Sequence, residues 1–269
     1  MRIAGNGDAK PLAENDELAD AEVPAAVVCA HCGDADCPGC PEEETRSGVV
    51  AVVAWERPGT PALGRLWATA RATTLDAERF FESLPDGPIA PALRFAVASE
   101  MLAAAAMATI VLIPISMAVP GWLHHLLFDE TAAALRLAAA GVPGLALILV
   151  AAHVAHGWAL DRGARRSGAS PATIRAVRFG LYAAGWDLVI GPLGIAILLA
   201  KEGGRAALSV ASVGIGLPGR SARAFLHGAY RLEGEAARPA LRASYVAAGL
   251  STILGAMAVI AGIVVALLS

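Results

Sequence analysis

Long apolar stretches, separated by short polar connections, fill the last 175 residues of the chain. The clearest of them, residues 243–269, contains no charged side chain. About 20 apolar residues in a helix cross a hydrocarbon core of about 30 Å. Because the backbone polar groups of a spanning segment must be satisfied within it, each span must be helical. The pattern therefore predicts an all-α fold, a polytopic helical membrane bundle.

The same pattern predicts five spans. Glu100 is the only charged residue of the first span and Asp187 the only one of the third. The fourth segment has only 14 residues, about 21 Å as a helix, so its length alone favours a buried or re-entrant piece. The predicted spans are residues 95–119, 137–160, 179–200, 206–219 and 243–269.

The basic residues favour a spanning fourth segment. Two connections, 161–178 and 220–242, contain five arginines each, whereas 120–136 has one and 201–205 has one lysine and one arginine. Basic residues in short connections favour the cytoplasmic side. If the fourth segment spans, both arginine-rich connections face the cytoplasm. If it does not, a connection with seven basic residues faces outward. Five spans with a cytoplasmic N-terminus are therefore expected, in what we interpret as a bacterial inner membrane.

The N-terminal part has a different composition. The whole chain is 56% hydrophobic and 17% charged, but residues 1–50 contain eleven acidic and only three basic side chains. Residues 1–28 have few large apolar side chains and are expected to form a disordered acidic tail. They also lack the layout of a secretory signal peptide. Residues 41–60 are interpreted as a linker that leads into the membrane-associated part.

Residues 61–94 carry the pattern of two short amphipathic helices. Leu63, Leu66 and Trp67 recur at helical spacing, and Phe80 and Phe81 follow in a second helix. We expect these helices to lie at the cytoplasmic face of the membrane, with the aromatic rings in the interface. The alternative is a small soluble cap packed on the bundle. Residues 95–269 make up the transmembrane domain.

All four cysteines lie within twelve residues, as two Cys-x2-Cys steps separated by four residues. Each step can present two thiolates to one tetrahedral zinc ion, and structural zinc is the preferred interpretation. Four residues between the steps is short for one ion, so free or redox-active thiols stay open. A disulfide pair is a further alternative that a cytoplasmic location disfavours. The predicted metal ligands are Cys29, Cys32, Cys37 and Cys40, in a zinc knuckle over residues 29–40.

Two apolar motifs carry a family resemblance. The segment 78–87 (ERFFESLPDG), followed by Pro91 and the first span, resembles the entry to Yip1-domain membrane proteins. Tyr182-Ala183-Ala184 is similar to the entry of that family's third helix. Bacterial members similar to this chain carry a cysteine-rich, zinc-finger-like head and a Trp-Glu step, here Trp55-Glu56. The resemblance implies five spans and a cytoplasmic N-terminus; it does not transfer the trafficking role of the eukaryotic members.

Motifs of enzymes are absent from the sequence. It has no His-Glu-x-x-His step, no Gly-x-Ser-x-Gly elbow and no phosphate-binding Gly-rich loop with Lys-Ser/Thr. We therefore expect a non-enzymatic membrane scaffold or adaptor. Its expected partners are the lipid bilayer and a cytoplasmic protein that docks on the zinc head, with no nucleic acid. An ion- or proton-coupled transporter is the alternative, although no inverted repeat is evident. An intramembrane enzyme is a third class and lacks a recognisable nucleophile–base pair.

The transporter alternative depends on ionisable residues inside the predicted spans. His153 is seven residues from the cytoplasmic end of the second span, and Asp187 is eight residues from that of the third. At about 1.5 Å per residue they lie roughly 10 and 12 Å deep, so we expect them to pair. His156 and Glu100 are expected to form a second, shallower pair. Such pairs either tie the helices together or line a path for an ion.

Overall fold

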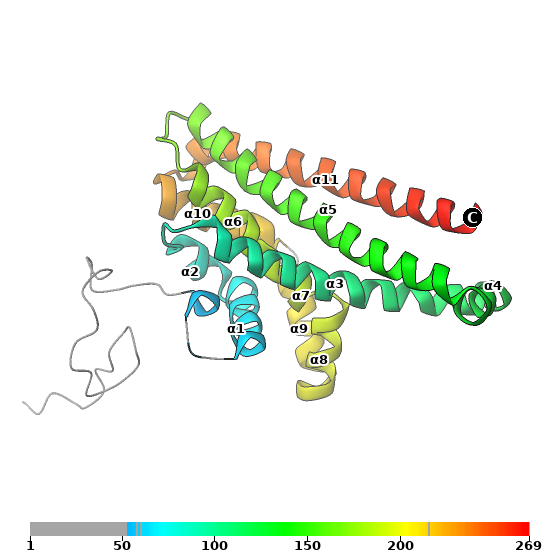
Figure 1. Ribbon diagram of the computed structural model, residues 1–269. Helices are drawn as coiled ribbons and strands as arrows, with labels where there is room; N and C mark the ends of the chain where they lie inside the picture. The colour runs from blue at the N-terminus through cyan, green and yellow to red at the C-terminus, as the bar shows by residue number, and fades with distance from the viewer. Residues whose placement is uncertain (1–52, 58, 60, 215, 269) are drawn as a thin grey trace, which may run out of the picture. The chain divides into compact units, whose positions relative to one another are not determined.

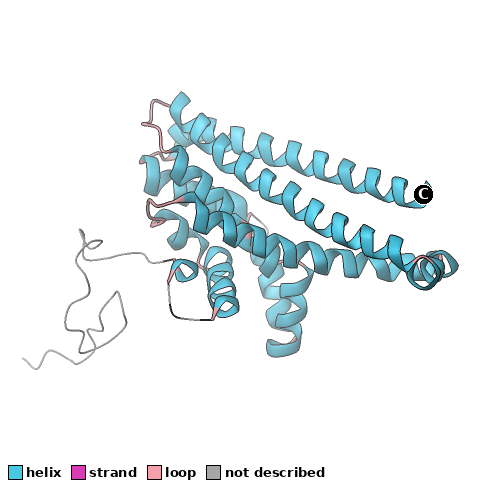
Figure 2. Ribbon diagram, in the orientation of Figure 1, coloured by secondary structure: helices cyan, strands magenta, loops and turns pink. Residues whose placement is uncertain are grey.

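The described residues of the computed structural model are 53–57, 59, 61–214 and 216–268, and they form helices and turns without a strand (Figure 2). This part of the chain is therefore all-α, as predicted. The longer helices are α1 (Ala62–Leu75), α3 (Ile89–Ala118), α5 (Thr131–Arg166), α6 (Thr173–Ala183), α8 (Pro192–Glu202), α9 (Gly204–Gly214), α10 (Leu217–Tyr230) and α11 (Gly234–Leu268). The short ones are η3 (Ala54–Glu56), α2 (Ala77–Glu82), α4 (Pro120–His124), η4 (His125–Asp129) and α7 (Gly185–Val189).

Among the described residues, α3 and residues 134–166 of α5 are each long and apolar enough to cross a membrane. A third candidate consists of two pieces, residues 173–189 and α8, which meet at an angle of 53°. The break lies at Gly191-Pro192, where proline has no N–H to continue the helical hydrogen bonds. The first two predicted spans thus correspond to α3 and α5. Helix α11 lies beside α5 over much of its length (Figure 1).

The predicted fourth span is not one helix. Helix α9 ends at Gly214 and α10 begins at Leu217, so residues 206–219 are divided between two elements. Gly216 lies between them with a φ of 77°, a left-handed conformation that glycine adopts without a steric penalty. Helix α9 has 11 residues, about 16 Å of helix, which is roughly half the thickness of a hydrocarbon core.

Helices α1 and α2 lie within residues 61–94, where two short helices are predicted, but not all of their aromatic residues face outward. Phe81 of α2 is fully buried, with its ring 4.6 Å from the ring of Phe179 and 5.9 Å from that of Trp186. Leu84, just after α2, is also fully buried. The prediction that both phenylalanines face the interface is therefore wrong for Phe81. Its apolar ring is covered by α6 and α7 rather than by lipid, as expected for a cap packed on the bundle.

The segment before α1 is bound to the core of the described part. The backbone N–H of Trp55 donates to the hydroxyl of Thr69, and its indole N–H donates to the carbonyl of Pro91, both at 2.8 Å. The carboxylate of Glu56 lies 3.0 Å from the guanidinium of the fully buried Arg178. The hydroxyl of Tyr182 donates to the same carboxylate. The Trp-Glu step therefore joins the segment before α1 to α3 and α6.

The carboxylate of Asp161 organises the connection between α5 and α6. It accepts hydrogen bonds from the N–H of Ala172 at 3.0 Å, from the Thr173 hydroxyl at 2.9 Å and from the Tyr230 hydroxyl at 2.7 Å. Arg165, one turn along α5, lies 2.7 Å away. Burial and the hydrogen bond to Asp161 raise the pKa of Tyr230, whose hydroxyl donates to this carboxylate. The cluster joins α10 to the α5–α6 connection.

Replacing Tyr230 with phenylalanine should lower the free energy of unfolding by about 1–3 kcal/mol, because it removes a hydrogen bond to a buried carboxylate. The change is expected as a lower melting temperature of the purified protein in detergent. Tyr245→Phe is the control, because the Tyr245 side chain is half exposed. Equal melting temperatures for the two variants would show that the hydroxyl of Tyr230 contributes nothing.

Candidate functional site

Three ionisable side chains from three helices meet beside the break in the third candidate span. Glu100 comes from the middle of α3, His153 from α5 and Asp187 from the short helix α7. We call them the Glu–His–Asp cluster. Their ligand-forming atoms all lie within 4.8 Å of one another. Ionisable groups within a candidate span are costly to bury, and they typically mark a binding site or an ion path.

Helix α7 is held in place by its packing against α1, and this fixes the position of Asp187. The indole N–H of Trp186 donates to the carbonyl of Thr73 at 2.8 Å. A Cβ on Gly185 would overlap the Thr73 hydroxyl, so glycine permits this close approach. Asp187 lies two residues after Gly185, and its side chain is directed away from α1, towards His153 on α5. The packing of α7 against α1 thus positions Asp187, one member of the cluster.

Both carboxylates approach the same nitrogen of His153. Its Nε2 atom is 3.0 Å from Oδ2 of Asp187, in hydrogen-bonding geometry, and 3.0 Å from Oε1 of Glu100. The pairing of His153 with Asp187 predicted from their depths is confirmed. One N–H cannot donate well to two carboxylates at once. Neither oxygen of Glu100 has a hydrogen-bond partner.

Exposure within the cluster increases from α3 to α7. The side chain of Glu100 is fully buried, that of His153 is 14% exposed and that of Asp187 is 42% exposed. The cluster is therefore closed on the Glu100 side and open on the Asp187 side, next to the broken helix. A buried carboxylate without partners loses several kcal/mol of solvation, unless a proton, a cation or a donor compensates it.

The second predicted pair does not form. His156 is buried, and its Nδ1 atom lies 3.1 Å from the hydroxyl of Ser244 on α11. Its ring stacks on Phe179, with centroids 5.6 Å apart. Glu100 contacts His153 instead. Residues three apart on a helix point about 60° apart, so both histidines face the bundle. Depth alone does not decide which of them meets α3 and which meets α11.

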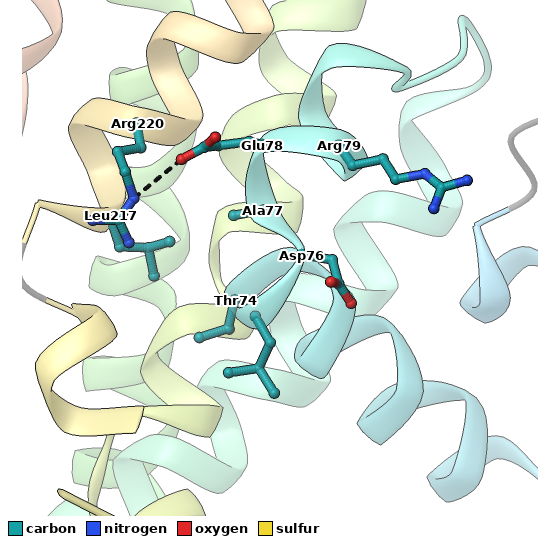
Figure 3. A pocket seen from close by; sticks show the side chains of 8 residues that line it. Thr74, Asp76, Ala77, Glu78, Arg79, Leu217 and Arg220 are labelled. Atoms are coloured by element: carbon teal, nitrogen blue, oxygen red, sulfur yellow. Dashed lines mark ion pairs between the residues drawn. The ribbon is translucent and has the colours of Figure 1, made fainter. Parts of the chain in front are cut away.

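An open pocket of about 310 Å³ lies between α1, α2 and α10 (Figure 3). Its lining includes Thr74, Asp76 and Arg79, and none of its lining residues belongs to the cluster. Glu78 and Arg220, on opposite walls, form an ion pair at 3.2 Å. The charges of these two residues compensate each other across the pocket.

The predicted zinc ligands Cys29, Cys32, Cys37 and Cys40 lie outside the described residues, as do the acidic tail and most of the linker. The zinc knuckle therefore stays a prediction. The Glu–His–Asp cluster contains no cysteine, and its three residues are not among the metal ligands predicted from the sequence.

No protein-family model, curated protein or solved structure matches the chain. The interpretation of the cluster therefore rests on its own geometry and chemistry.

Substitutions of Asp187 test the pairing. Asp187→Asn keeps an acceptor for His153 and should change stability little, whereas Asp187→Leu removes it and should cost about 1–3 kcal/mol. The measurement is thermal unfolding in detergent. His125 and Asp129 form an exposed pair with a similar separation of 2.9 Å, so Asp129→Leu is a matched control without a measurable effect. If Asp187→Leu is as harmless as the control, the contact does not stabilise the bundle.

Proposed function

We propose that this protein is an ion-coupled carrier whose membrane domain binds a cation at the Glu–His–Asp cluster. The observation that carries the proposal is the fully buried carboxylate of Glu100, whose 3.0 Å contact with Nε2 of His153 lacks hydrogen-bonding geometry and is shared with Asp187. A carboxylate that only ties helices together would have a donor of its own, because a buried carboxylate with incomplete hydrogen bonding is costly. A site that takes up and releases a cation needs a carboxylate left available in this way.

The broken helix beside Asp187 supports the same function. Carriers commonly build their ion sites at discontinuous helices, where freed backbone carbonyls and helix ends face the ligand. Here α7 and α8 are separated at Gly191-Pro192, four residues beyond Asp187. Non-helical backbone within a membrane is tolerated where it is buried in protein or lines a water-filled cavity. The partly exposed side chain of Asp187 provides the corresponding route to the cluster.

The proposed topology has five passages and a cytoplasmic N-terminus. The arginines of 161–178 and 220–242 support it, because short basic connections favour the cytoplasm. The short α9 would be the fourth passage, which requires local thinning of the bilayer. A reporter that is active only in the cytoplasm should work before Trp55 and within both arginine-rich connections, and should fail after Ser269. An active reporter after Ser269 would contradict this topology.

Proteoliposomes test the carrier directly. The full chain, reconstituted with a pH-sensitive dye or a divalent-ion indicator inside, should move protons or divalent cations down an imposed gradient. Glu100→Gln should abolish the flux because it removes the available charge. His156→Asn is the matched control, since His156 bonds to Ser244 outside the cluster, and it should retain the flux. Correctly inserted protein that moves no cation would refute the carrier.

A membrane scaffold or adaptor with a cytoplasmic zinc-binding head, as in the resemblance to Yip1-domain proteins, is the second candidate function. It is favoured by the bonds of Trp55 and Glu56, because they fix the segment that follows the cysteine region to the bundle. Such a connection suits a head that presents a docking surface. If the protein has this function, the purified chain should contain zinc, and replacing Cys32 and Cys37 with serine should remove it. Membrane insertion should persist. Protein purified under reducing conditions without this zinc would contradict it.

A further inference from the structure

We infer that Glu100, His153 and Asp187 bind one divalent transition-metal ion of the Zn²⁺ class and leave one coordination position open. The inference names the cation of the carrier proposed above and rests on that proposal. It concerns a site within the membrane domain, separate in sequence from the cysteines of residues 29–40.

The spacing of the ligand atoms fits a single ion. Two contacts to His153 Nε2 measure 3.0 Å, and all the ligand-forming atoms lie within 4.8 Å of one another. In a tetrahedral zinc site, bonds of about 2.0–2.2 Å place ligand atoms roughly 3.3–3.5 Å apart. Small side-chain rotations therefore bring the three groups to bonding distance of one ion. Three protein ligands and one open position are the arrangement typical of zinc sites that exchange a ligand.

The incomplete hydrogen bonding of the buried Glu100 is a further indication of a ligand. Both of its carboxylate oxygens are buried and lack hydrogen-bond partners. Asp187 already accepts from Nε2 of His153, so this nitrogen cannot serve both carboxylates well. A metal at the centre would replace these competing contacts: it would bind the imidazole nitrogen directly and accept one oxygen from each carboxylate.

The charge and ligand types select the class of metal. Two carboxylates with a neutral imidazole amount to two negative charges, which a divalent cation balances. An imidazole ligand suits Zn²⁺ and neighbouring transition metals, whereas Mg²⁺ and Ca²⁺ prefer oxygen ligands only. Soft ions that select thiolates would favour the cysteines instead. The open side at Asp187, next to the broken helix, lets an ion enter and leave.

The experiment uses the full chain with all four cysteines replaced by serine, so that thiolates do not bind the added metal. Purified in detergent and loaded with Zn²⁺, this protein should retain about one ion per chain. Its X-ray absorption fine structure should show nitrogen and oxygen ligands with one imidazole and no sulfur. Protein that retains no zinc, or a spectrum without imidazole or with several, would overturn the inference. This measurement needs no substitution in the bundle.

Substitutions in the same serine background locate the ion. Glu100→Gln and His153→Asn should each weaken Zn²⁺ binding by more than about 100-fold, since loss of even an outer hydrogen-bond partner weakens a metal site roughly 10–100-fold. His156→Asn, one turn away on α5, should bind as the parent does. If all three folded variants lose zinc equally, or if none does, the zinc is not bound at the cluster and the inference is wrong.

Binding and flux separate this inference from the proposed carrier. Zinc bound at the cluster without any flux in proteoliposomes would refute the carrier and leave a structural metal site. Proton flux that requires Glu100 but occurs in protein that binds no zinc would refute the metal and leave the carrier.

Discussion

Replacing Gly157 with valine should prevent the membrane domain from folding. Gly157 on α5 faces Gly180 on α6 where the two helices cross, and a Cβ at Gly157 would overlap the backbone carbonyl of Ala176. Backbone cannot rotate away as a side chain can, so the helices would have to separate. Overpacking a tight core costs about 1–3 kcal/mol, and this overlap with backbone should cost more. Small residues at such crossings let membrane helices approach closely.

The measurement is thermal unfolding in detergent, together with monodispersity on size-exclusion chromatography. Gly141→Val is the matched control, because Gly141 lies on the same helix and a Cβ there would meet nothing within 4 Å. Only the Gly157 variant should aggregate or melt far below the parent. Similar behaviour of the two variants would show that α5 and α6 are not in close contact.

The same crossing bears on the cluster. A Cβ on Gly180 would overlap the carbonyl of His153, so α6 touches α5 at the residue that supplies the imidazole. Asp187 follows on α7, a few residues beyond α6. Separating these helices therefore moves Asp187 away from His153. Gly180→Ala, a smaller perturbation, should weaken metal binding as well as stability.

Replacing Arg178 with methionine should have the second largest effect on stability. Arg178 is fully buried and donates to the carbonyl of Pro88 at 2.6 Å, while its guanidinium lies 3.0 Å from the carboxylate of Glu56. The substitution removes the buried partner of a pair whose other member, Glu56, is 24% exposed, and it should cost at most about 3–5 kcal/mol. The melting temperature should fall, and the protein should become susceptible to proteolysis near Trp55, because the segment before α1 loses its contact with α6.

An exposed ion pair provides the control. Arg238 lies 2.6 Å from Glu235, and both side chains are more than half exposed. Arg238→Met should therefore leave stability unchanged. Combining Arg178→Met with Glu56→Met should cost less than the sum of the two single changes, since the residues act as a pair. Additive effects would mean that Arg178 stabilises the bundle without Glu56.

Local patterns in the sequence predicted the elements that depend on near neighbours. The runs around Glu100 and His153 are apolar over enough residues to form α3 and α5, and Gly191-Pro192 marks the break in the third candidate span. The pairing of His153 with Asp187 also followed from the sequence. Depth along a helix depends only on residue count, and the basic connections place the two helix ends at the same level.

Other features depend on how the helices rotate and cross, which no local pattern contains. Arg178 was counted as a charge of a cytoplasmic connection, yet it is buried against Glu56, more than a hundred residues earlier in the chain. Phe81 has the amphipathic spacing of an interfacial residue and is covered instead by α6 and α7. Amphipathic spacing identifies an apolar face, but it does not say whether lipid or protein covers that face.

The contact between Glu100 and His153 likewise depends partly on sequence position and partly on helix packing. Residue counts along the predicted spans were enough to place the histidines and carboxylates at similar depths. The packing of the helices is what brings His153 to α3 and α7 and His156 to Ser244 on α11. A difference of about 60° around one helix separates the two outcomes. Helix geometry fixes that angle, but the rotation of α5 about its own axis depends on packing such as that of Gly157 against Gly180, where the two backbones approach closely.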